Sequence, residues 1–178
     1  MNIEFGCGQF PMNEDFLTSD CRDLPGIDFV CNVWDIEKHV EPNTVDHVYS
    51  RHMFEHLTFA QGSRTLDAWN SILKKDGICE IIVPNMTFHI KQWLYQRDDP
   101  EEFQHALGGL WGWQMDAPLW EGKCDVTSDE ELEKIWDVHK SGYDLKLLRE
   151  LLTNKGFKDI ISLEPVTSWH LHVKAIKG

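Results

Sequence analysis

The chain of 178 residues carries 30 acidic against 17 basic residues, a formal charge of −13 at pH 7. This length suits one domain with a full hydrophobic core. The negative surface repels phosphate backbones and anionic lipids, so we expect neither a nucleic-acid nor a membrane partner.

The spacing of the cysteines and the lack of targeting signals indicate a reducing cellular compartment. The five cysteines are widely spaced and form no CxxC pair, which argues against a disulfide framework or a four-cysteine zinc site. No apolar run is long enough to span a bilayer, and the N-terminus lacks the pattern of a signal peptide. We therefore expect a single cytoplasmic domain over residues 1–178.

The first half of the chain is predicted to alternate strands with turns before a long helix. The expected strands, judged by apolar alternation, are residues 2–5, 16–19, 27–33 and 45–50. Helical spacing of apolar residues follows over 52–73, interrupted at 61–63 and ended by Lys74-Lys75-Asp76-Gly77. A buried strand over 78–83 comes next.

The second half is predicted to contain two helices and a closing hairpin. Residues 86–97 and 143–155 have helical patterns, and the second of these is amphipathic. The stretch of about 98–140 between them is rich in tryptophan and irregular, so we interpret it as an insertion near the substrate. Strands over 157–163 and 168–176 end the chain. Strands alternating with helices predict an α/β, doubly wound, mostly parallel sheet.

The connection between the first two strands is unusually short. Residues 9–15 join them and include Pro11. A parallel crossover normally needs a dozen or more residues. We expect at most a helical turn there, or a shifted strand pairing.

A glycine loop follows the first strand directly. Gly6 and Gly8 let the backbone approach a ligand closely, and Asp20 ends the next strand, where its carboxylate can bind ribose hydroxyls. The third predicted strand ends in a segment with an amide, a carboxylate and an indole, residues 32–35. A dinucleotide fingerprint needs a third glycine where this chain has Pro11, so the loop is not typical of an NAD site.

At this point the sequence resembles the class I S-adenosylmethionine-dependent methyltransferases, in particular the small type 11-like members often linked to surface-polysaccharide or phage gene sets. The matching motifs, in chain order, are Glu4-Phe5-Gly6-Cys7-Gly8, Asp20, Asn43-Thr44-Val45-Asp46, Ser50-Arg51-His52, Glu55-His56-Leu57, Leu73-Lys74-Lys75-Asp76-Gly77, Val83-Pro84-Asn85, Gly112-Trp113-Gln114, His139-Lys140-Ser141-Gly142-Tyr143-Asp144 and Lys155-Gly156-Phe157. They span nearly the whole chain.

The resemblance implies a Rossmann-like sheet of seven strands whose last strand is antiparallel, and S-adenosylmethionine as cofactor. The residues that it implies for the cofactor are Phe5, Gly6, Cys7, Gly8, Asp20, Cys21, Asn32, Val33, Trp34, Asp35, Ser50 and Arg51. Either Asn32 or Asp35 holds the adenine in this interpretation.

The expected reaction is an in-line displacement that transfers the methyl group to a small-molecule or sugar acceptor. Positioning the acceptor about 3 Å from the methyl group supplies much of the rate, and a base is needed only for a hydroxyl acceptor. The candidate bases are His139, His52, Asp116 and Tyr143, of which His139 is preferred because it precedes a helix on the acceptor side. Tryptophans 111, 113, 120 and 136 form either a small core or a lid.

Two alternatives remain open. His52-Met53-Phe54-Glu55-His56 matches the HxxEH pattern of inverted zincins, in which a helix would bring His52 and His56 to one zinc ion with Glu55 as base. That alternative leaves the glycine loop unexplained, and we predict no metal ligands within the methyltransferase interpretation. The second alternative is a protein that binds S-adenosylmethionine without catalysis. The oligomeric state and the methylated atom are not indicated by the sequence.

Overall fold

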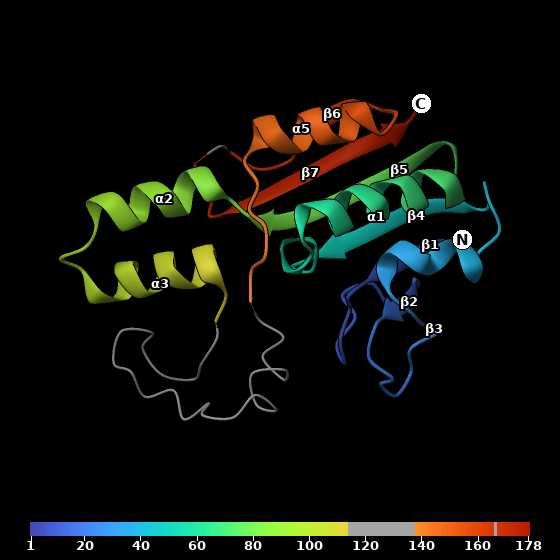
Figure 1. Ribbon diagram of the computed structural model, residues 1–178, viewed down its shortest axis with the longest axis horizontal. Coiled ribbons are helices and arrows are strands. Elements are labelled where there is room, and N and C mark those ends of the chain that lie inside the picture. Colours follow the sequence, from blue (N-terminus) through green and yellow to red (C-terminus); the bar gives the residue numbers. More distant parts are fainter. Residues whose placement is uncertain (114–137, 166) are drawn as a thin grey trace.

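The computed structural model describes residues 1–113, 138–165 and 167–178, and these form a seven-stranded sheet in the order β3-β2-β1-β4-β5-β7-β6 (Figure 1). The strands are β1 (Asn2–Phe5), β2 (Leu17–Asp20), β3 (Phe29–Val30), β4 (Val45–Arg51), β5 (Leu73–Pro84), β6 (Phe157–Ser162) and β7 (His170–Lys177). The first five pair in parallel, and β7 is antiparallel to both neighbours. The predicted Rossmann-like, mostly parallel sheet with an antiparallel last strand is confirmed.

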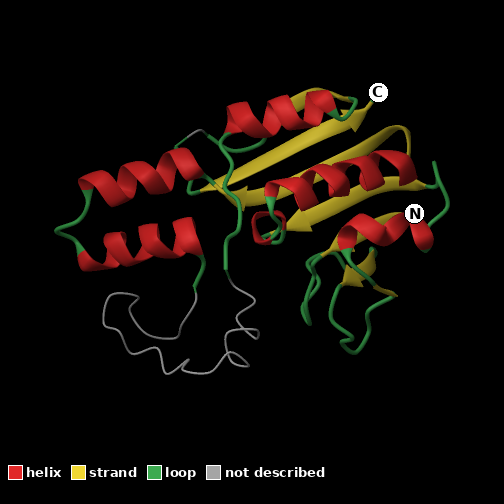
Figure 2. Ribbon diagram, in the orientation of Figure 1, coloured by secondary structure: helices red, strands yellow, loops and turns green. Residues whose placement is uncertain are grey.

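The helices connect these strands as Figure 2 shows. They are the short 3₁₀ helices η1 (Val33–Lys38) and η2 (Phe54–His56), and the α-helices α1 (Phe59–Ile72), α2 (Met86–Tyr95), α3 (Pro100–Trp111) and α5 (Leu145–Asn154). Within the described parts of the chain, no helix is long and apolar enough to cross a membrane.

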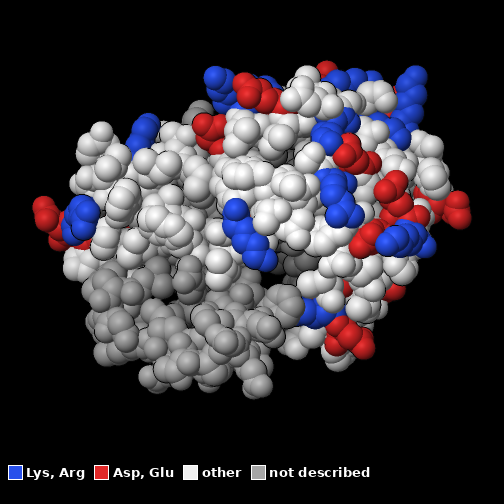
Figure 3. Space-filling model, viewed as in Figure 1, with Lys and Arg blue, Asp and Glu red and all other residues white. Residues whose placement is uncertain are grey.

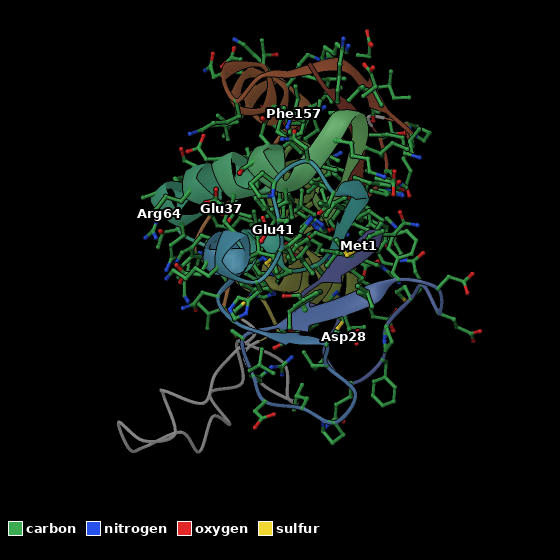
Figure 4. The ribbon with its side chains drawn as sticks, turned by 90° about the vertical axis from the view of Figure 1, so that its right-hand side faces the viewer. Met1, Asp28, Glu37, Glu41, Arg64 and Phe157 are labelled. Atoms are coloured by element: carbon green, nitrogen blue, oxygen red, sulfur yellow. The ribbon has the colours of Figure 1, made fainter. Side chains whose placement is uncertain are left out.

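The hydrophobic core lies between the sheet and the helices η1, α1 and α5, which cover the same face (Figures 1 and 4). Along β7, Leu171, Val173 and Ala175 are buried against this face, because successive side chains of a strand point to opposite sides. Trp69 of α1 is fully buried against the rings of Phe5 and Phe54. Charged side chains of both signs are interspersed over the outer surface of these helices (Figure 3).

The short connection after β1 contains turns only, and β1 still pairs directly with β2, with Ile3 opposite Leu17. The buried carboxylate of Glu4 makes this possible. It accepts hydrogen bonds from the backbone N–H groups of Met12 and Asn13 at 3.0–3.1 Å and from the Asn13 side chain at 2.9 Å. These bonds satisfy backbone groups that a crossover helix would otherwise satisfy internally.

The predicted break in the helix after β4 lies at a different place. Thr58 caps α1: its hydroxyl accepts from the Gln61 N–H at 3.2 Å, and the Gln61 side chain accepts from the Thr58 N–H at 2.9 Å. Gly62 is therefore inside the helix and not at an interruption. A Cβ at Gly62 would lie 3.0 Å from the Tyr143 hydroxyl, so the glycine permits a close contact.

Three other boundaries differ from the prediction. Lys74–Gly77 was expected to end a helix but belongs to β5, where Asp76 adopts a left-handed conformation with φ of 63°. The expected strand over 27–33 is reduced to β3, because η1 starts at Val33. Part of the expected irregular segment is α3, whose N-terminus is capped by Asp99 with Pro100 in the first turn. Residues 114–137 lie outside the described residues.

Candidate active site

The loop after β1 turns at two glycines that both adopt left-handed backbone conformations, with φ of 68° at Gly6 and 59° at Gly8. The Gly6 N–H donates to the Ser19 carbonyl at 2.7 Å, which ties the loop to β2. A Cβ at Gly6 would lie 2.2 Å from Cγ of Met53, so no side chain fits there. The loop lies at the carboxyl ends of the parallel strands, where ligands bind in open α/β sheets.

Beside this loop is a cavity of about 410 Å³, which we call the glycine-loop cavity. Its volume falls in the range of about 300–1,000 Å³ typical of small-molecule sites. The lining residues come from the ends of β1, β2 and β3, the start of η1, the segment after β4, helix α1 and the segment before α5. They are Gly6, Ser19, Asp20, Cys21, Arg22, Cys31, Asn32, Val33, Trp34, His52, Met53, His56, Leu57, Gln61 and Lys140. Six of the residues predicted for the cofactor are among them: Gly6, Asp20, Cys21, Asn32, Val33 and Trp34.

Asp20 lies at the end of β2 and is fixed from two sides. Its Oδ2 accepts from the Gly8 N–H at 3.0 Å, and its carboxylate accepts from Nε and Nη2 of Arg22 at 2.9 and 3.1 Å. Burial alone would raise the pKa of Asp20, but the hydrogen bonds from Arg22 and Gly8 hold the pKa below its usual range. Asp20 is therefore an ionised acceptor at the cavity wall.

Asn32 and Asp35 take different positions relative to this cavity. Asn32 lines the glycine-loop cavity, whereas Asp35 does not and pairs with Lys38 at 2.7 Å on η1. Trp34 lines the cavity as well, and the guanidinium of Arg64 lies 5.6 Å from the centre of its ring. The segment after β3 thus presents an amide and an indole ring to the cavity.

Five other predicted cofactor residues lie outside the cavity lining: Phe5, Cys7, Gly8, Ser50 and Arg51. Phe5 is buried in the core against Trp69. The Gly8 N–H donates a hydrogen bond to the Asp20 carboxylate. Burial, with the negative charges of Asp20 and Glu4, raises the pKa of the Cys7 thiol to about 11, so this cysteine is not a thiolate at neutral pH.

A second cavity of about 340 Å³ adjoins the first, and we call it the histidine cavity. It is lined by six histidines and six other residues: His52, Glu55, His56, Pro84, His89, His105, Gly108, Gly109, Trp113, His139, Trp169 and His170. His52 and His56 line both cavities. Burial lowers the pKa of His89 to about 4 and also lowers the pKa values of His105 and His170. These three imidazoles are neutral at pH 7.

His52 follows β4 in a left-handed conformation with φ of 49°, which is uncommon for a non-glycine residue. Its Nδ1 lies 3.2 Å from Oε1 of Glu55, a residue that is 1% exposed. The buried carboxylate therefore orients the His52 ring where the two cavities meet.

His139 reaches the histidine cavity from a segment far along the chain. Its Nδ1 lies 3.1 Å from the Gly109 carbonyl, and its Nε2 lies 4.0 Å from Oε1 of Glu55. The N–H groups of Lys140 and Ser141 donate to the Glu55 carbonyl at 2.9 and 3.1 Å. The segment that starts at Val138 is thereby joined to η2.

The other two predicted bases are placed differently. Tyr143 is 1% exposed and lines neither cavity; its ring packs against Phe54 and Phe59, and its hydroxyl accepts from Ser141 at 3.1 Å. This position is structural, so we do not retain Tyr143 as a base. Asp116 lies outside the described residues, as do Trp120 and Trp136.

The helix expected for the HxxEH pattern is not formed. His52 precedes η2, while Glu55 and His56 lie within it. His52 and His56 are therefore not one helical turn apart. The predicted inverted-zincin geometry, in which both histidines lie on one helix, is not formed.

Sequence reasoning missed several cavity residues. Arg22, Met53, Leu57, Gln61 and Lys140 line the glycine-loop cavity, and His89, His105 and His170 line the histidine cavity. The three histidines come from α2, α3 and β7, so no local pattern connects them. Arg22 was the most accessible to prediction, because it lies two residues after Asp20.

A family model described as a methyltransferase domain matches residues 2–148. An Archaeoglobus fulgidus SAM-dependent methyltransferase is 15% identical, with 99% of this chain and 85% of that chain covered and a TM-score of 0.62. Burkholderia thailandensis 1,6-didemethyltoxoflavin-N1-methyltransferase, solved with S-adenosylhomocysteine, is 14% identical, with 99% and 70% covered and a TM-score of 0.56. These two likenesses concern the fold.

Among curated proteins, protein translocase subunit SecA of Polynucleobacter asymbioticus is 31% identical over 102 residues. The match covers 56% of this chain and 10% of that protein. The chain thus corresponds to about a tenth of this relative's length.

Proposed function

Because the chain belongs to the methyltransferase-domain family, we propose that it methylates a hydroxyl oxygen of a small-molecule or sugar acceptor bound in the histidine cavity, with S-adenosylmethionine in the glycine-loop cavity. The observation that carries this proposal is the junction of the two cavities at His52 and His56. A methyl donor and an acceptor must meet within van der Waals distance, and this junction provides the place.

The residues of the glycine-loop cavity fit the cofactor. The cradle at Gly6 admits no Cβ, and the ionised Asp20 offers acceptor oxygens to ribose hydroxyls. Asn32 supplies an amide and Trp34 an aromatic face for the adenine. When bound, S-adenosylmethionine supplies a methyl group already activated by the sulfonium charge, so the protein needs no covalent nucleophile.

The residues of the junction suit a hydroxyl acceptor, which must lose its proton. His52 is the proposed base: Nδ1 is oriented by Glu55, and Nε2 takes the proton from the acceptor. His139, preferred on sequence grounds, lines only the histidine cavity and stays a second candidate. The tryptophan lid also stays a prediction, with Trp113 at the cavity wall.

The experiment is calorimetric titration of the purified chain with S-adenosylhomocysteine, followed by transfer of radiolabelled methyl groups to a panel of hydroxylated small molecules and sugars. Micromolar binding with label in at least one acceptor supports the proposal. No binding of S-adenosylhomocysteine would overturn it. Label transferred only to amines would overturn the choice of oxygen.

A further inference from the structure

We propose that Glu55, His56 and His139 bind a divalent transition-metal ion at the junction of the two cavities, and that this ion holds the acceptor oxygen. The metal site itself stands on the geometry of these three residues. Only its role toward the acceptor rests on the proposed function.

The three side chains already converge. One carboxylate oxygen of Glu55 and one ring nitrogen each of His56 and His139 lie within 4.8 Å of one another. The rings of the two histidines have centroids 5.2 Å apart. Two imidazoles and one carboxylate are a donor set for Zn²⁺, Co²⁺ or Fe²⁺, and three protein ligands leave at least one coordination position open.

The hydrogen bonds of both imidazoles prepare them as ligands. Nδ1 of His56 lies 3.2 Å from the Val138 carbonyl, and Nδ1 of His139 lies 3.1 Å from the Gly109 carbonyl. A carbonyl oxygen only accepts, so each Nδ1 carries the proton and each Nε2 has the lone pair. Metal-binding histidines typically have this arrangement, in which a carbonyl fixes the tautomer and the ring orientation.

Glu55 provides an independent indication. Its residue is 1% exposed, and its Oε2 has no hydrogen-bond partner among the described residues, while Oε1 faces His52. A buried carboxylate oxygen without a partner is costly. A cation between Glu55 and the two imidazoles would satisfy it.

The fold brings the ligands together without a metal. The backbone carbonyl of Glu55 accepts from the N–H groups of Lys140 and Ser141, which fixes the 138–141 segment beside η2. The site is therefore organised in advance, so binding an ion does not require these segments to assemble.

The location assigns a role to the ion. His56 lines both cavities, and Glu55 and His139 line the histidine cavity. An ion held there faces the acceptor at the point where the methyl donor meets it. A hydroxyl coordinated to such an ion would be fixed in orientation and would lose its proton more readily. The structure thus points to an acceptor whose hydroxyl oxygen can coordinate a metal.

The test is a titration of the full chain with Co²⁺, followed by visible absorption spectroscopy. We expect one equivalent to bind with the bands of a nitrogen and oxygen ligand set. Glu55→Gln, His56→Gln and His139→Gln should each weaken binding by at least about tenfold. The exposed His39 provides the matched control, since His39→Gln removes an imidazole away from the site.

Circular dichroism and S-adenosylhomocysteine calorimetry on the same samples separate the possible failures. Absence of Co²⁺ binding by the wild type, binding that persists in all three folded variants, or the intense near-ultraviolet bands of cysteine ligation would overturn the metal site. Retained Co²⁺ binding without S-adenosylhomocysteine binding would leave the metal site standing and overturn the proposed function.

Discussion

The two cavities of the site are built in different ways. The glycine-loop cavity is formed largely by consecutive residues at the ends of neighbouring parallel strands, such as Gly6 after β1 and Asp20 on β2. The histidine cavity is formed by side chains from η2, α2, α3, β7 and the segment before α5. The first is fixed by the sheet itself, whereas the second depends on how separate elements pack against its edge.

The two cavities also differ in their titratable groups. The first holds the ionised Asp20, whose pKa is lowered. The second holds His89, His105 and His170, whose pKa values burial lowers and which are therefore neutral at pH 7. Acidification is therefore expected to disturb the acceptor side before the cofactor side.

The largest effect is expected at the junction. His52→Gln keeps a side chain that can contact Glu55 but removes the proton acceptor, so kcat for a hydroxyl acceptor should fall by roughly 10²–10⁴-fold. The affinity for S-adenosylhomocysteine should change little in comparison. Steady-state kinetics with an acceptor found by the panel screen, together with calorimetry, measure both quantities.

A matched control variant checks the role of His52. His39→Gln should behave as the wild type. An unchanged kcat in His52→Gln would exclude His52 as the base.

The second prediction concerns the neutral histidines. The pKa of His89 falls to about 4 through burial and the nearby His105 and His170, against about 6.5 in an unfolded chain. The unfolded chain therefore takes up a proton at a higher pH than the folded one. The stability that this difference contributes is present above about pH 6.5 and is lost as pH falls toward 4. It amounts to about 3 kcal/mol.

Urea unfolding at a series of pH values measures this loss. His89→Gln should flatten the dependence between pH 6.5 and 4, whereas His39→Gln should not. Calorimetry at pH 5 tests the cofactor side separately, because S-adenosylhomocysteine should still bind through the ionised Asp20. Equal pH dependence in the wild type and His89→Gln would show that His89 is not the group responsible.

The glycine-loop cavity could be predicted from the sequence better than the histidine cavity, because its residues follow consecutive strands. The sheet, the glycine loop and Asp20 follow from local patterns, and the family match with the fold confirms the methyltransferase class and S-adenosylmethionine as its cofactor. The helix α3 was missed because tryptophan and glycine obscured its pattern, although Asp99 and Pro100 mark its start. His89, His105 and His170 meet only in three dimensions, so spacing along the chain gave no sign of them.

The third prediction concerns the proposed contact between the Asp20 carboxylate and the ribose of the cofactor. Asp20→Ala should weaken S-adenosylhomocysteine binding by about 1–3 kcal/mol, or roughly 5- to 150-fold, because a charged hydrogen-bond acceptor for the ribose is lost. Isothermal titration calorimetry measures the change. Since Asp20 also binds Arg22, thermal unfolding of the variant must show that it is folded. Unchanged affinity in a folded variant would remove Asp20 from the site.

The smallest effect decides between Asn32 and Asp35 for the adenine. Asn32 lines the glycine-loop cavity, so Asn32→Ala should weaken S-adenosylhomocysteine binding by about 1 kcal/mol, the contribution of one neutral hydrogen bond. Asp35 pairs with Lys38 outside that lining, so Asp35→Ala should leave the affinity unchanged. The same calorimetric titration compares the two variants, whose substituted positions lie close together in the sequence. The reverse result would mean that η1 rearranges when the cofactor binds, and that even the sheet-built side of the site adapts to its ligand.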